Sequence, residues 1–317
     1  MALVQVFIPS HNRPKSVIKT VESVLNQSFM DYELIISDNS TNNQTNEIFA
    51  HYNYSNVKYI KREPALTSIE HFNRILSEVT SEFFMIFHDD DVMHENMIEC
   101  LYNSFIEHQN IFAVGANAFI VRNGKNSNKK IFRTSKNDLV LSNPIDVAKQ
   151  YAAIGGIVPF PSYMYKKEVA QKLRFDLSKG GKYCDAAFIL DISTLGKIIF
   201  LERPTMDYSI HSGQDSQNYS YRQCTELLTY IRKVTGLRNN NKVIREFRIQ
   251  NIYLDLKQGI QNRRISLLSR KYLRSLNILF RTSLFLYFPR ILVLSFIHTL
   301  KFSISEVKLS SDSSQND

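Results

Sequence analysis

Short apolar runs alternate with helical periodicities along the first 120 residues of the chain. One periodicity places Val17, Val21, Val24 and Leu25 on the same face of a helix. Strands that alternate with helices are typical of βαβ units, so the pattern predicts an α/β fold with a mostly parallel sheet flanked by helices. The predicted strands cover residues 4–9, 33–36, 57–60, 83–87 and 112–121, and the predicted helices lie around residues 17–25, 46–51, 69–79 and 95–108.

Polar clusters follow three of the predicted strands, at residues 10–13, 38–40 and 89–91. In open α/β sheets, ligands bind beyond the carboxyl ends of the strands. The three clusters are therefore expected to meet at one edge of the sheet and to form a binding site.

The pattern changes in the second half of the chain. Residues 123–143 are polar and are expected to form a mobile excursion. Residues 282–300 are mostly apolar but carry Pro289, Arg290 and His298, which leaves three interpretations: a membrane-spanning helix, an interfacial helix pair, or a buried C-terminal helix. The expected division is a first domain over residues 1–220, a basic helical region associated with a membrane over residues 221–309, and a disordered tail over residues 310–317.

Positive charge is concentrated in the C-terminal third. Residues 221–308 hold 17 Lys and Arg against 4 Asp and Glu, whereas the whole chain holds 39 against 30. A basic segment favours an anionic partner, either lipid headgroups or nucleic acid. The long aliphatic run in this segment favours lipid over nucleic acid, because a nucleic-acid groove is typically polar with spaced aromatic residues.

Cysteine usage excludes two classes of small scaffold. Cys100, Cys184 and Cys224 are odd in number and widely spaced, which excludes a disulfide-stapled scaffold and a CxxC zinc site. The natural interpretation is a reducing, cytoplasmic setting. The N-terminus has no basic segment followed by an apolar one, so no secretory signal is expected.

Asp89, Asp90 and Asp91 form the sharpest chemical feature. Three adjacent carboxylates repel one another unless a cation or solvent neutralises them. At the end of a buried strand, Asp89 and Asp91 could reach one Mg²⁺ or Mn²⁺ ion, which such sites share with substrate phosphates. The alternative is an acidic surface turn without a ligand.

Five ordered motifs resemble those of the family 2 glycosyltransferases, which have the GT-A fold. The chain matches four sequence patterns of the family and an Asn that precedes the last of them. The patterns are P-x-Y/H-N, S-x-L-x-Q-T/S, D-D/N-G/S-S-T and E-Y/F-I-x-F-L-D-x-D-D. The matching segments are FIPSHNRP at residues 7–14, SVLNQS at 23–28, SDNST at 37–41, HFNR at 71–74 and EFFMIFHDDD at 82–91.

The resemblance implies a role for each matching residue in binding a nucleotide-sugar and Mn²⁺ or Mg²⁺. Asp38 would contact the base or ribose, although an ordinary Asx-turn is the alternative, and Arg13 could be only a surface charge. The resemblance assigns nucleotide-sugar binding to Pro9, Ser10, Asn12, Arg13, Asp38, Asn73, Asp89 and Asp90, and metal binding to Asp91, Asp89 and His211. His211 matches a late Y-R-x-H-x-x-Q-x-S element; otherwise it is a polar surface residue.

The family also places a catalytic carboxylate in an E-D pair 90 to 100 residues after the acidic motif. The matching segment is GGKYCDAAF at residues 180–188, in which Asp185 takes the role and Cys184 replaces the usual Glu. Inversion at an anomeric carbon needs such a base to accept the acceptor's proton. A helix N-cap is the alternative role for Asp185, and Asp191 is the alternative base.

The resemblance implies an inverting, metal-dependent glycosyltransferase with a UDP-sugar as donor. Its acceptor would be a lipid-linked glycan of a bacterial surface polysaccharide such as O-antigen or capsule, at the inner face of the cell membrane. Two other hypotheses stay open: a basic module that binds nucleic acid or membranes without catalysis, and a different metal-dependent phosphate enzyme such as a nucleotidyltransferase. The chain has no Gly-rich phosphate loop, which disfavours the last.

Overall fold

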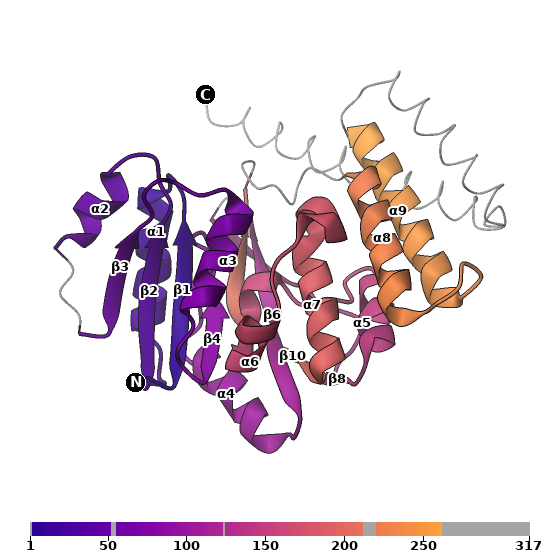
Figure 1. The fold of residues 1–317 in the computed structure, drawn as a ribbon, viewed down its shortest axis with the longest axis horizontal. Coiled ribbons are helices and arrows are strands. Elements are labelled where there is room, and N and C mark those ends of the chain that lie inside the picture. The colour runs from indigo at the N-terminus through magenta and orange to yellow at the C-terminus, as the bar shows by residue number, and fades with distance from the viewer. Residues whose placement is uncertain (1, 52–54, 123, 212–219, 262–317) are drawn as a thin grey trace, which may run out of the picture. The chain divides into compact units, whose positions relative to one another are not determined.

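A computed structural model describes residues 2–51, 55–122, 124–211 and 220–261. The chain divides into two compact units, residues 1–214 and residues 215–317. The residues 282–300 and 310–317, which the sequence assigns to a membrane-associated or buried helix and to a tail, lie outside the described residues. Figure 1 labels the helices and most of the strands.

A mixed sheet with helices on its faces forms the first unit, which confirms the predicted architecture. The strands lie in the order β3-β2-β1-β4-β9-β6-β10-β5, with β7 paired to β6 and β8 paired to β10. Their bounds are β1 (Val4–Ser10), β2 (Tyr32–Asp38), β3 (Val57–Lys61), β4 (Phe83–Ile86), β5 (Val92–Met93), β6 (Ile111–Arg122), β7 (Lys125–Lys130), β8 (Leu139–Leu141), β9 (Tyr163–Lys166) and β10 (Lys197–Ile210).

The helices begin and end within three residues of the predicted positions in the first half of the chain. Pro14 starts α1, where the missing proline N–H would be unpaired in any case. Thr67 and Glu70 form a capping box at the start of α3. The bounds are α1 (Pro14–Leu25), α2 (Gln44–Phe49), α3 (Ser68–Glu78), α4 (Met97–Glu107), α5 (Pro144–Tyr151), α6 (Lys167–Lys172) and α7 (Cys184–Leu195), with 3₁₀ turns at Phe160–Ser162, Leu177–Lys179 and Gly181–Tyr183.

The parallel part of the sheet carries the predicted strands. β3, β2, β1 and β4 are parallel neighbours, and β6 is parallel to β10. β9 is antiparallel to both β4 and β6, so β4 and β6 run in the same direction. Phe83, Met85 and Phe87 alternate along β4 and its end and belong to the main core cluster, as period-2 alternation requires.

Residues 123–143 differ from the predicted mobile excursion, because they contain β7 and β8. β7 has the sequence KNSNKK, which shows no apolar alternation, and it forms through backbone pairing with β6 instead. The close pairing of β6 with β9 depends on Gly115, where a Cβ atom would lie 2.7 Å from the ring of Tyr163.

The described part of the second unit consists of α8 (Tyr221–Thr235) and α9 (Lys242–Gln261). Ser220 caps α8 by accepting a hydrogen bond from the N–H of Gln223, and Gly236 ends the helix in the left-handed conformation. No helix among the described residues is both long and apolar enough to cross a bilayer.

Candidate active site

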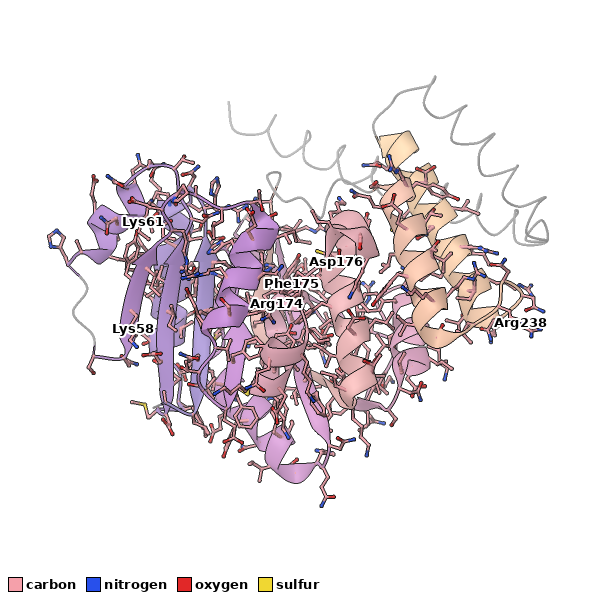
Figure 2. The ribbon with its side chains drawn as sticks, viewed as in Figure 1. Lys58, Lys61, Arg174, Phe175, Asp176 and Arg238 are labelled. Atoms are coloured by element: carbon pink, nitrogen blue, oxygen red, sulfur yellow. The ribbon has the colours of Figure 1, made fainter. Side chains whose placement is uncertain are left out.

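The carboxyl ends of four strands bring the polar clusters together at one edge of the sheet. β1 leads into residues 10–13, β2 into residues 38–41, β4 into residues 88–91, and β10 ends at residues 209–211. Because β1, β2, β4 and β10 share one direction, these four segments lie at the same edge. Figure 2 labels Lys58, the second residue of β3, and Lys61, its last residue, which lies at this edge.

The three carboxylates of Asp89, Asp90 and Asp91, called the acidic triplet below, do not lie on an exposed surface turn. Asp89 is 5% exposed and Asp91 is 0% exposed. Nη1 of Arg13 lies 3.0 Å from Oδ1 of Asp89 and 3.0 Å from Oδ2 of Asp90, so one guanidinium group bridges two carboxylates. Arg13 is therefore part of the site and not an isolated surface charge.

Asp90 receives a second positively polarised group from β10. Nε2 of His211 donates a hydrogen bond to Oδ2 of Asp90 at 2.8 Å. Burial acts to raise the pKa of Asp90, but His88, His211 and Arg13 together hold this pKa below its usual value. Asp90 is thus ionised, and Arg13 after β1 and His211 after β10 orient it.

Asp91 is buried with one carboxylate oxygen unpaired. Its Oδ1 accepts a hydrogen bond from the N–H of Ser209 at 2.8 Å, whereas its Oδ2 has no donor among the described residues. Burial raises the pKa of Asp91 well above its usual value, and the neighbouring carboxylates of Asp90 and Asp89 add to the shift. A buried oxygen without a partner costs free energy that a bound cation would offset.

His88, Asp90 and Asp91 are the residues that the geometry groups around one point. Each offers a ligand atom, and the three atoms lie within 4.8 Å of one another. An imidazole with two carboxylates can ligate several divalent metal ions, Mn²⁺ among them. The Oδ2 of Asp91, which has no donor among the described residues, fits the same interpretation. The residues present therefore fit a divalent metal ion.

This trio differs from the expected metal ligands Asp91, Asp89 and His211. Asp89 is held by Arg13, and His211 contacts Asp90. His88 was missed, although a signal was present: in the motif L-D-x-D-D, residue 88 occupies the first acidic position. The rings of Phe72 and Phe160 lie 6.4 and 5.8 Å from the ring of His88 and restrict its orientation.

The first loop is joined to the loop after β2. Asn12 adopts the left-handed conformation, with φ of 54°, and its N–H donates to Oγ of Ser40 at 2.8 Å. Its Oδ1 accepts a hydrogen bond from the N–H of Thr41 at 3.0 Å. Pro9 and Ser10 are the last two residues of β1 and place this loop at the edge of the sheet.

Asp38 is fully buried, and both of its carboxylate oxygens are engaged. Oδ1 accepts from the N–H of Ser40 at 3.0 Å, which is the Asx-turn that was the alternative interpretation. Oδ2 accepts from the hydroxyl of Tyr59 at 2.6 Å and from Nζ of Lys61 at 3.2 Å. In this arrangement Asp38 fixes the loop, and Tyr59 and Lys61 are partners that the sequence did not identify.

The side chain of Asn73 joins α3 to the backbone of Phe175, which is distant in the sequence. Its Nδ2 donates to the carbonyl of Phe175 at 3.0 Å, and its Oδ1 accepts from the N–H of Phe175 at 2.8 Å. Phe175 is labelled in Figure 2. The amide of Asn73 therefore pairs with both the N–H and the carbonyl of Phe175. Neither hydrogen bond joins Asn73 to the triplet.

Asp185 is the second residue of α7 and faces tyrosines. Burial raises the pKa of its carboxyl. The same carboxylate acts electrostatically on Tyr151, Tyr163 and Tyr165, and the hydroxyls of Tyr163 and Tyr165 are buried without a hydrogen-bond partner in the described part of the chain. No hydrogen bond or ion pair between described residues joins Asp185 to the triplet.

Asp191, the alternative base, lies in an ion pair. Its Oδ2 is 2.7 Å from Nζ of Lys179, and the side chain is buried in α7. The two carboxylates thus differ: Asp191 is neutralised by a lysine, whereas Asp185 has a raised pKa of the kind that suits a general base.

Comparison with known proteins places the chain among sugar transferases. The family model described as Glycosyl transferase family 2 matches residues 5–172. The chain is 25% identical over 225 residues to the poly(ribitol-phosphate) beta-N-acetylglucosaminyltransferase TarP of Staphylococcus aureus, which covers 69% of this chain and 66% of that protein. It is 24% identical over 113 residues to the Escherichia coli UDP-Glc:alpha-D-GlcNAc-diphosphoundecaprenol beta-1,3-glucosyltransferase WfgD, which covers 36% of this chain and 45% of that protein.

The fold is similar to that of a solved structure. S. aureus TarS, residues 1–349, in complex with UDP-GlcNAc superimposes with a TM-score of 0.65 at 15% identity, covering 88% of this chain and 81% of that one. A likeness of this extent supports the fold assignment. The chain spans two thirds or less of the length of the two curated relatives named above.

Proposed function

Because the chain belongs to glycosyl transferase family 2, we propose that it transfers a sugar from a nucleotide-sugar to a hydroxyl group of a glycan acceptor. The observation that carries the proposal is the buried Asp91, whose Oδ2 has no hydrogen-bond donor in the described part of the chain. Asp91 is grouped with Asp90 and His88 at the carboxyl edge of the sheet. A site built to hold a divalent cation there is suited to a nucleoside diphosphate, whose charge the cation shares.

His88, Asp90 and Asp91 would hold Mn²⁺ or Mg²⁺, and the ion would supply positive charge against the departing diphosphate. Arg13 adds a fixed cation on the other side of Asp89 and Asp90. The loops at residues 10–13 and 38–41, which are joined through Asn12, would line the nucleotide pocket.

Asp185 is proposed as the general base of an inverting transfer. The acceptor hydroxyl gives its proton to the Asp185 carboxylate while its oxygen forms the new bond to the anomeric carbon. The bond from that carbon to the diphosphate oxygen breaks, and the nucleoside diphosphate leaves. The raised pKa of Asp185 supports this role, because a base with a pKa closer to neutral holds the proton more readily.

UDP is the proposed nucleotide and a lipid-linked surface glycan is the proposed acceptor. The TarS complex contains UDP-GlcNAc, and WfgD acts on a diphosphoundecaprenol-linked sugar, which supports both choices by similarity. The proposed first domain covers residues 1–220, and the basic region that follows it covers residues 221–309. The positive charge of this basic region supports binding of the protein to the anionic inner face of the cell membrane.

The test is nucleotide release from UDP-, GDP- and dTDP-sugars with Mn²⁺, with and without a chelator. We expect chelator-sensitive release of UDP without pyrophosphate, and its loss in Asp91→Asn. Asp207→Asn is the matched control, since Asp207 also lies on the site side of β10 but pairs with His94. Metal-independent release, or full activity in Asp91→Asn, would contradict the proposed metal site.

A further inference from the structure

The candidate base and the candidate metal ligands lie on separate elements of the first unit. His88, Asp90 and Asp91 follow β4. Asp185 is the second residue of α7, and no hydrogen bond or ion pair between described residues joins it directly to that trio. An inverting transfer needs the base and the departing diphosphate on opposite sides of the anomeric carbon, and a misplacement of about 1 Å can lower the rate about 10²-fold. Packing between the two elements therefore sets a separation on which the reaction depends.

The ring of Phe175 connects these two elements. It is stacked on Phe188 of α7, with ring centroids 4.2 Å apart and an interplanar angle of 18°. It also packs against Phe72 at 5.3 Å and Phe160 at 5.8 Å, the two rings that restrict the orientation of His88. Phe175 is 5% exposed. A continuous row of aromatic rings thus runs from the end of β4 to α7.

Phe188 and Asp185 lie on the same face of α7. They are three residues apart, which places their side chains next to each other along one side of a helix. The ring of Phe188 packs against Tyr165 of β9 at 6.0 Å, and the charge of Asp185 acts on the same tyrosine. The position of the carboxylate is therefore tied to the ring that Phe175 contacts.

Asn73 of α3 holds the backbone of Phe175. Its Oδ1 accepts from the N–H of Phe175 at 2.8 Å, and its Nδ2 donates to the carbonyl at 3.0 Å. Phe175 lies between α6 and the 3₁₀ turn at Leu177–Lys179, so these two hydrogen bonds replace those that a helix or a strand would supply. At the end of this turn, Nζ of Lys179 is 2.7 Å from Oδ2 of Asp191 in α7. The segment is thus attached to α3 at one end and to α7 at the other.

We infer that Asn73 and Phe175 are positioning residues that set the distance and direction between the metal site and the general base. The inference rests on the proposed function, which assigns these roles to Asp91 and Asp185. It also gives Asn73 a task other than the expected nucleotide-sugar contact, because the oxygen and the nitrogen of its amide both bond to Phe175. A change at either residue should slow the reaction without weakening the binding of the donor.

The test compares Asn73→Leu and Phe175→Leu with two matched controls. Asn117 pairs with the N–H and the carbonyl of Phe132 in the same way, each at 2.9 Å, but it lies on β6. Phe105 is similarly buried, at 7% exposed, and packs against Phe83 from α4. The controls are Asn117→Leu and Phe105→Leu.

The first measurement separates kcat from donor binding. We expect kcat for UDP release from a UDP-sugar to fall about 100-fold in Asn73→Leu and Phe175→Leu. The Kd of UDP in the presence of Mn²⁺ should stay within twofold of the wild-type value. Both controls should lower the melting temperature, and a control that remains folded should keep kcat.

Two outcomes of this measurement overturn the inference. Weaker UDP binding with an unchanged kcat in Asn73→Leu would return Asn73 to the nucleotide-sugar site. Equal losses of kcat in the site variants and in a folded control would mean that Asn73 and Phe175 serve only the stability of the fold. The double variant Asn73→Leu/Phe175→Leu should lose about as much kcat as Phe175→Leu alone, because both residues act through one contact.

A distance measurement separates failure of this inference from failure of the proposed function, since it needs neither metal nor sugar. Spin labels are attached at Ser77→Cys on α3 and Thr194→Cys on α7, both exposed positions, in the full-length protein carrying Cys100→Ser. Pulsed EPR then reports the separation of the two helices. A broader or shifted distribution in Asn73→Leu and Phe175→Leu, and not in the controls, supports the inference even if no nucleotide-sugar is turned over. A distribution that matches the wild type in both site variants overturns it.

Discussion

His211 donates a hydrogen bond to Asp90 at 2.8 Å, although 121 positions separate the two residues in the sequence. The contact joins the end of β10 to the end of β4, and Asp90 also receives Arg13 from the end of β1. Asp90 is therefore oriented from two sides before any ligand binds, as side chains around a metal site often are.

Replacing His211 with Ala should lower transfer by about 10- to 100-fold, the loss typical when a group that orients a metal ligand is removed. The measurement is kcat/KM for the nucleotide-sugar at saturating Mn²⁺. His94→Ala is the matched control, because His94 pairs with Asp207 and not with the triplet. Equal losses in both variants would mean that His211 serves only the local fold of β10.

Asp91→Asn should abolish Mn²⁺-dependent transfer while making the metal-free protein more stable. The amide keeps an oxygen for the N–H of Ser209 but removes a carboxyl group whose ionised form is disfavoured by burial and by Asp89 and Asp90. We expect the free energy of unfolding without metal to rise by about 1 kcal/mol. Thermal unfolding with and without Mn²⁺ measures both effects; a variant that Mn²⁺ still stabilises as strongly as the wild type would contradict the assignment of Asp91.

Asp185→Asn and Asp191→Asn should separate the two candidate bases. The first should lower kcat by about 10³-fold with little change in nucleotide-sugar binding, because only the proton acceptor is lost. The second should lower the melting temperature, since it leaves Lys179 without the carboxylate 2.7 Å away. In the wild type, kcat should fall as the pH drops through the raised pKa of Asp185, and loss of kcat in Asp191→Asn alone would reverse the assignment.

The strand-end clusters were predictable from the sequence because each follows a short apolar run that favours a buried strand. Position 88 was harder to assign, since a histidine interrupts the acidic pattern and its grouping with Asp90 and Asp91 depends on rings that pack from α3 and residue 160. The roles of Asp38 and Asn73 depend on partners that no local pattern reveals, namely Lys61 on β3 and the backbone of Phe175.

The sequence pattern did not predict β7, for a different physical reason. Its residues bury no apolar side chain, so its stability comes from backbone pairing with β6 and from contacts such as Lys130 with Glu202. A pattern of hydrophobic positions carries no information about such a strand.

His71 should make the protein less stable in mild acid. The side chain is 4% exposed on α3, its Nε2 lies 2.7 Å from Oγ of Ser37, and Nε of Arg62 donates to the same hydroxyl. Burial and the charge of Arg62 lower the pKa of His71 to about 4, so the folded protein keeps the imidazole neutral where the unfolded chain, with a pKa near 6.5, becomes protonated.

The unfolded state therefore binds more protons between pH 6.5 and about 4, and stability falls as the pH decreases through this window. The loss from His71 alone should approach about 3 kcal/mol at the lower end. The measurement is the free energy of unfolding by urea at pH 7.5, 6.0 and 5.0 for the wild type, His71→Gln and His108→Gln. His71→Gln should flatten the slope, whereas His108→Gln, an exposed replacement after α4, should keep it. A slope unchanged in His71→Gln would mean that other groups, and not this buried imidazole, set the acid sensitivity of the fold.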